Sequence, residues 1–166
     1  MRAQGFSKPS LATAMLLAGA PPAAAASAYL AAAAVLAFAS AVIVRLQPAL
    51  FTAALFLGAL AWGVGNLLWV AGGAIPKLAG WWIAFLVLTI AGERLDLSRL
   101  MPARRGSQAL FIASASFVIM GALEGITYSV GARLFGLGLL ICAIWLLRHD
   151  IARRNVRATA APRFFA

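Results

Sequence analysis

Charged residues are scarce in this sequence. Only 11% of its 166 residues are Asp, Glu, Lys or Arg, and 64% are hydrophobic, whereas a typical soluble domain has about 25% charged residues. A soluble fold with so few polar side chains would have too little polar surface to cover itself. The composition and a mean hydropathy of +0.95 therefore predict a membrane protein whose apolar surface is covered by lipid.

Metal ligands and catalytic side chains are scarce as well. The sequence has one cysteine, Cys142, and one histidine, His149. One cysteine excludes an internal disulfide, and one cysteine with one histidine provides too few ligands for a zinc, copper or haem site. The sequence has no glycine-rich phosphate loop, no Ser/His/Asp or Cys/His set and no HExxH motif. We therefore expect a protein that is not an enzyme and needs no cofactor or metal.

Acidic residues number four, against fourteen Lys and Arg, which gives a net charge of +10. The basic residues lie in short segments between apolar runs, so the expected partner is anionic lipid headgroups and not nucleic acid. Two basic segments, a loop at residues 94–107 and a tail at residues 148–166, are expected to provide the contacts, through Arg94, Arg99, Arg104, Arg105, Arg148, Arg153, Arg154 and Arg157.

Long apolar runs are what the sequence does contain. Because a helix rises 1.5 Å per residue, about 20 apolar residues cross a hydrocarbon layer of about 30 Å. The block at residues 109–147 is about twice that length and is expected to fold back at the turn-forming residues 125–131. The sequence predicts an all-α polytopic bundle in a single membrane domain, 1–166, with about five full spans, near 24–44, 49–73, 77–95, 109–127 and 131–147.

The N-terminal segment, residues 1–23, allows three interpretations. Its apolar helix near residues 9–20 would be about 18 Å long, which is shorter than the hydrocarbon layer. It is either an interfacial helix or a sixth crossing in a thinned bilayer. Arg2 and Lys8 before an apolar run, with alanines after it, also match a signal peptide. At the other end, the abrupt stop after PRFFA fits a fragment of a longer polytopic protein.

Basic residues also predict the orientation, since they favour the cytoplasmic side of a membrane. Placing the 94–107 loop in the cytoplasm puts Arg45 and the 148–166 tail there too, and leaves Lys77 and Arg133 outside. Abundant arginine and alanine are common in proteins from GC-rich bacterial genomes. We therefore expect a bacterial inner membrane protein with a cytoplasmic C-terminus.

Two segments carry a family resemblance: GALAWGVGNLLWVAGG (58–73) and WWIAFLVLTIAGERLDLSRLMP (81–102). The second runs from a Trp pair, typical of a membrane interface, through an apolar stretch into a charged helix end. Both resemble the spans of polytopic bacterial inner-membrane proteins of an uncharacterised family. The resemblance implies the location and the architecture, and no activity.

Three polar side chains lie within the apolar runs: Glu124, Arg133 and Asn66. An acid inside a membrane is costly and is often functional. Glu124 and Arg133 flank the expected turn, so we predict an ion pair that holds this hairpin together; a proton or substrate site at Glu124 is the alternative. Asn66 is expected to hydrogen-bond to a neighbouring helix or, alternatively, to contact a ligand.

Gly121 and Gly125 form a GxxxG motif, which allows two helices to approach closely. The motif predicts tight packing, including a possible contact with a membrane-protein partner or a second copy. Two functions fit the sequence. The preferred one is a non-catalytic assembly, scaffold or accessory component, or part of a larger polytopic protein. The alternative is a small transporter or proton-coupled carrier that uses Glu124 and Asn66.

Overall fold

The computed structural model describes residues 19, 22–97, 106–125 and 129–149. Within these residues the protein is all-helical, and every helix is long and apolar enough to cross a membrane. The helices are α2 (Pro22–Leu46), α3 (Leu50–Val70), α4 (Ile75–Leu97), α5 (Ser107–Glu124) and α6 (Ser129–His149). The five spans expected from hydropathy are thus confirmed. The N-terminal helix near 9–20 and most of the 148–166 tail lie outside the described residues.

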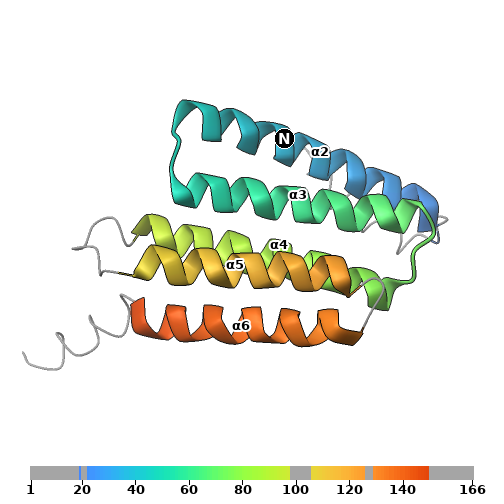
Figure 1. The fold of residues 1–166 in the computed structure, drawn as a ribbon. Coiled ribbons are helices and arrows are strands. Elements are labelled where there is room, and N and C mark those ends of the chain that lie inside the picture. Colours follow the sequence, from blue (N-terminus) through green and yellow to red (C-terminus); the bar gives the residue numbers. More distant parts are fainter. Residues whose placement is uncertain (1–18, 20–21, 98–105, 126–128, 150–166) are drawn as a thin grey trace, which may run out of the picture.

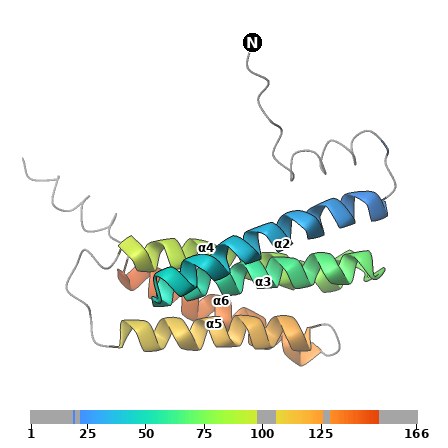
Figure 2. The same cartoon turned by 90° about the horizontal axis from the view of Figure 1, so that it is seen from above.

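Successive helices run antiparallel, with α2 at one edge and α6 at the other (Figure 1). The closest contacts join α2 to α3, α3 to α4, and α5 to α6, while α4 links the α5–α6 hairpin to the rest. The view from above shows α2 crossing α3 and α4 obliquely, with α5 along one side of the bundle (Figure 2). We call the two ends of the bundle the Lys77 end, where α4 begins, and the Arg45 end, where α2 finishes.

Local sequence explains where the chain turns. After α3, Gly72 has a φ of +86°, and the N–H groups of Gly72 and Gly73 donate to the carbonyls of Trp69 and Leu68 at 2.9 Å each. This hydrogen-bond pattern closes helices whose following glycine is left-handed. In the first turn of α3, the Thr52 hydroxyl accepts a hydrogen bond from the Ala49 N–H at 3.1 Å and donates one to the Gln47 carbonyl at 2.8 Å. Side chain and backbone thus fix both ends of α3.

Small residues let α3 approach α4. Gly58 and Gly65 are seven residues apart, so both lie on the same side of α3. A Cβ atom at Gly58 would lie 3.3 Å from the Phe85 carbonyl oxygen, and one at Gly65 would lie 2.7 Å from Trp82 Nε1. Larger side chains at these two positions would push the helices apart.

The α5–α6 hairpin packs even more tightly. A Cβ atom at Gly121 would overlap the Phe135 backbone nitrogen, and one at Gly138 would lie 2.7 Å from the Val118 nitrogen. The GxxxG motif therefore does bring helices together, but the helix that covers Gly121 is α6 of the same chain. Any surface for a partner has to lie elsewhere than at Gly121.

Two apolar clusters form the core. One lies toward the Arg45 end and the other toward the Lys77 end, and both are built from α3, α4 and the α5–α6 hairpin. Their buried members are Ala54, Ala91, Leu95, Phe111, Cys142 and Trp145, and Ala61, Trp81, Ala84, Val118 and Ala122, respectively. Among the five helices, α2 buries the smallest share of its apolar residues.

Candidate functional site

Asn66 is a buried polar side chain in the middle of α3, with 2% of its surface exposed. Its amide nitrogen donates to the Trp62 carbonyl of its own helix at 2.9 Å, and it forms no hydrogen bond to another helix within the described ranges. The predicted interhelical bond is therefore absent. The amide instead uses the carbonyl one turn back in its own helix, an acceptor that the helix places within reach of an Asn side chain.

Aromatic side chains also pair across α2, α3 and α4. Trp62 of α3 stacks on Phe85 of α4 with centroids 5.2 Å apart. Trp69 meets Trp82 edge-on at 5.8 Å, and Tyr29 of α2 lies 6.2 Å from Trp69. Such pairs stabilise by about 0.5–1.5 kcal/mol beyond their buried area. These ring contacts therefore help to hold α2, α3 and α4 together.

Two indole N–H groups in the first part of α4 lack hydrogen-bond partners among the described residues. The Nε1 atoms of Trp81 and Trp82 are covered by protein, and neither has an acceptor in the part of the chain that the structure describes. Trp81 is only 4% exposed and belongs to the core cluster at the Lys77 end. The sequence located both tryptophans at a membrane interface but did not foresee that Trp81 would be buried or that both indole N–H groups would be covered.

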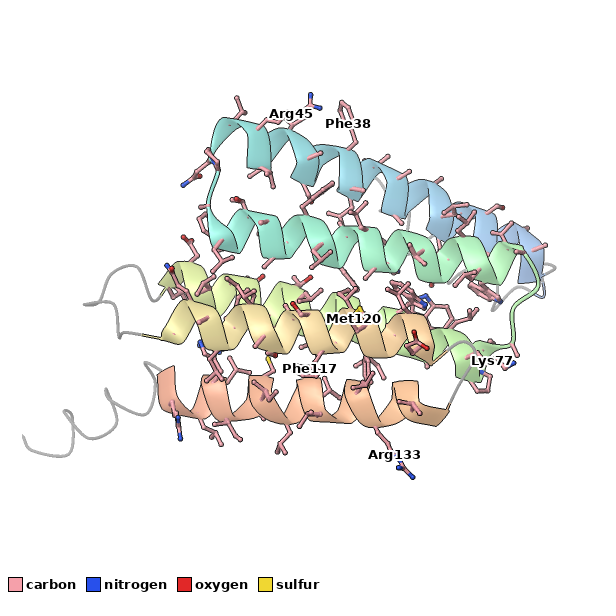
Figure 3. The ribbon with its side chains drawn as sticks, in the orientation of Figure 1. Phe38, Arg45, Lys77, Phe117, Met120 and Arg133 are labelled. Carbon is pink, nitrogen blue, oxygen red and sulfur yellow. The ribbon has the colours of Figure 1, made fainter. Side chains whose placement is uncertain are left out.

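Glu124 and Arg133 do not form the predicted ion pair. Glu124 is half-buried at the end of α5, while Arg133 is exposed and points away from α5 (Figure 3). The geometry of α6 explains this: a Cβ atom at Gly131 would overlap the backbone at Gly125, so Gly131 faces α5. Arg133 follows by two residues, about 200° around the helix, and so it faces outward. The prediction of an ionic clasp is wrong.

Charge removal at these two positions should therefore have independent effects. We expect the double variant Glu124→Gln/Arg133→Gln to lose the sum of the two single changes in free energy of unfolding, within about 0.5 kcal/mol. Reversible unfolding of the four proteins in mixed micelles measures this coupling. A coupling above about 1 kcal/mol would show that the two side chains interact directly.

Two hydrogen bonds that do cross between helices were missed by the sequence analysis. The Ser114 hydroxyl of α5 donates to the Gly138 carbonyl of α6 at 3.1 Å. The Trp145 indole N–H lies 3.0 Å from the Ser107 carbonyl and 3.1 Å from its hydroxyl. One signal was available: Ser114 precedes Gly121 by seven residues, and hence shares its packed face of α5.

Only two of the eight arginines predicted to contact headgroups are among the described residues. Arg94 and Arg148 are exposed near the ends of α4 and α6, at the Arg45 end of the bundle. This is where a headgroup contact requires them. The other six predicted arginines, Arg99, Arg104, Arg105, Arg153, Arg154 and Arg157, lie outside the described residues.

The described ranges contain no cluster of three or more His, Cys, Asp or Glu that could hold a metal ion. No curated protein and no solved structure matches the chain. One family model does match, over residues 2–166, and its description is "Domain of unknown function (DUF8744)". Because that match covers nearly the whole sequence, the chain belongs to the DUF8744 family.

Proposed function

We propose that the protein is a non-catalytic integral component of the bacterial inner membrane, with an assembly, scaffold or accessory role or as one part of a larger polytopic protein. Its C-terminus faces the cytoplasm in this proposal. The support for that orientation is the positive-inside rule applied to the 94–107 loop and the 148–166 tail. Exposed Arg94 and Arg148 then lie at the level of anionic cytoplasmic headgroups.

One observation carries the proposal: apart from the indoles of Trp81 and Trp82, the buried polar side chains of the described residues bond to the chain's own backbone. The hydroxyl, amide or indole group of each of five side chains donates to a main-chain carbonyl. The donor residues are Ser40, Thr52, Asn66, Ser114 and Trp145. The bonds of Ser114 and Trp145 join α5 to α6, and an interhelical bond contributes about 0.6–2 kcal/mol inside a membrane. The bonds of Ser40, Thr52 and Asn66 reach carbonyls of their own helix or of its preceding turn. The interior polarity thus serves packing and presents no reactive constellation.

The alternative is a small transporter or proton-coupled carrier, which the half-buried Glu124 favours. A carrier site needs its polar groups to face a shared interior. Ala122 faces α4, since it lies about 4 Å from the Cβ position of Gly80. Glu124 follows by two residues and so faces away from α4. Asn66 lies on α3, which packs against α4, so the two candidate residues do not share a site.

Proton flux separates the two functions. Liposomes that contain the full-length protein and carry an imposed pH gradient should leak protons no faster than empty liposomes. Glu124→Gln should leave this rate unchanged, because the acid is not part of a pathway. An interior pH-sensitive dye measures the rate. A flux above that of empty liposomes that disappears in Glu124→Gln would establish the carrier and reject the proposal.

A further inference from the structure

The unpartnered indoles of Trp81 and Trp82 require an explanation, because buried donors in native proteins almost always have an acceptor. Trp145 shows how this chain treats such a group: it is 1% exposed, and its N–H reaches Ser107. Trp81 is buried to nearly the same extent, 4% exposed, yet its N–H reaches no acceptor among the residues that the structure describes. An acceptor from outside the chain would complete this site.

A cation lies one turn away from Trp81. Lys77 precedes Trp81 by four residues, so the two side chains share a face of α4 and are separated by about 6 Å along the helix axis. Helical side chains lean toward the N-terminus, which tilts the Trp81 ring toward the turn of Lys77. Lys77 is exposed and forms no ion pair with any residue within the described ranges. It extends from the end of α4 (Figure 3).

The partly positive N-terminus of α4 adds to this charge. The site therefore offers an anion-binding group at the end of the bundle and, one turn deeper, a neutral N–H donor among apolar side chains. An inorganic anion would use only the first of these. A ligand that uses both the cation and the N–H donor needs a phosphate group and, a few ångströms closer to its hydrocarbon chains, a carbonyl oxygen. Ester-linked glycerophospholipids have this arrangement.

The fold also provides a way in for such a molecule. Trp81 packs in the cluster that includes Ala61 of α3 as well as Val118 and Ala122 of α5. It therefore lies where α3 and the α5–α6 hairpin meet α4, at the inner edge of the seam between α4 and the hairpin. Contacts across this seam are far fewer than those within the hairpin. Gly80 and Ala122 face one another there at about 4 Å. The seam is therefore the least costly place for a lipid to separate helices.

We propose that the Lys77 end of this seam binds a glycerophospholipid, with its phosphate at the Lys77 ammonium and an ester carbonyl accepting from the Trp81 indole N–H. The Trp82 indole is not part of this site, because its Nε1 atom faces Gly65 of α3. This site is independent of the assembly role proposed above, since a carrier could hold a lipid in the same way.

Lipid binding to the purified, delipidated full-length protein tests the site. Native mass spectrometry counts the adducts formed with ester-linked phosphatidylglycerol, with its ether-linked analogue, which lacks both carbonyls, and with inorganic phosphate. We expect the ester lipid to bind at least fivefold more tightly than the ether lipid, and phosphate alone not to bind. Equal binding of the two lipids, or binding of phosphate alone, would overturn the proposal.

Variants with matched controls locate the contacts. Lys77→Gln should weaken binding of the ester lipid about tenfold, whereas Arg133→Gln, which removes another exposed cation from the same end, should leave it unchanged. Trp81→Phe should abolish the preference for ester over ether, and Trp145→Phe should retain it. The preference is measured within each variant, so a general loss of stability does not imitate it. Equal effects of Lys77→Gln and Arg133→Gln would reject the site.

Discussion

Gly121→Ala is expected to lower the free energy of unfolding by about 3 kcal/mol, near the upper end for overpacking one methyl group. The new Cβ atom would overlap the Phe135 backbone nitrogen, which cannot move without shifting the whole of α6. Gly138→Ala should behave similarly, because its Cβ would lie 2.7 Å from the Val118 nitrogen. Reversible unfolding in mixed micelles, followed by circular dichroism, measures the loss.

Gly136 provides the control, two residues from Gly138 in the same helix. Nothing lies within 4 Å of a Cβ atom there, so Gly136→Ala should be neutral or stabilise the helix by up to about 1 kcal/mol through its higher helix propensity. If Gly121→Ala and Gly136→Ala had equal effects, the backbones of α5 and α6 could not be in direct contact.

Trp145→Ala is expected to lower the free energy of unfolding by about 3–5 kcal/mol. The ring is 1% exposed and contacts Phe111 with centroids 5.3 Å apart, and its N–H is hydrogen-bonded to Ser107 of α5. Truncation removes both interactions and leaves a cavity between the hairpin helices. Trp145→Phe should lose less, since it keeps most of the packing and gives up the hydrogen bond.

Phe38 is the matched aromatic control, because it is 73% exposed on α2 and points away from the bundle (Figure 3). Phe38→Ala should change the free energy of unfolding by less than about 0.5 kcal/mol. The same micelle unfolding assay applies. A loss for Phe38→Ala as large as that for Trp145→Ala would indicate that exposure in the monomer does not describe the protein in its membrane.

The five helices could be predicted from the sequence because the length of an apolar run and the need to satisfy backbone hydrogen bonds in lipid leave few alternatives. Helix pairing was harder to predict. Gly58 and Gly65, like Gly131 and Gly138, are spaced by seven residues and mark a packed face, but a sequence repeat does not say which helix covers that face. GxxxG identified the close approach at Gly121 without identifying α6 as the neighbour.

The candidate site shows where reasoning from the sequence stops. Glu124 and Arg133 flank a turn, and proximity along the chain favoured an ion pair. The rotation of α6 set by Gly131 against Gly125 turns Arg133 outward. The spacing of Gly131 and Gly138 marks the packed face of α6 but does not say that α5 covers it. Asn66 was correctly identified as an unusual polar residue. Its amide could bond either across to another helix or back to its own, and the sequence pattern does not decide between the Trp62 carbonyl and an acceptor on a neighbouring helix.

Small residues between the helices and polar side chains bonded to the backbone both serve contacts within the chain. Glycine faces in α3, α5 and α6 are used within the chain, whereas α2 packs chiefly against α3 and buries the smallest share of its residues. In an assembly role, α2 is therefore the helix with the most surface left for neighbouring molecules. The alanines along α2 would permit close approach there, as they do toward α3.

Extraction of native membranes directly into polymer-bounded lipid discs tests the proposed assembly role without disturbing weak membrane contacts. Tagged protein should be recovered together with a second polypeptide in a fixed ratio, in particles larger than those of one 17.3 kDa chain with its lipid. Glu124→Gln should leave that ratio unchanged, since no polar pathway is needed for assembly. Recovery of the chain alone, in discs that hold a single copy, would contradict the proposed assembly role.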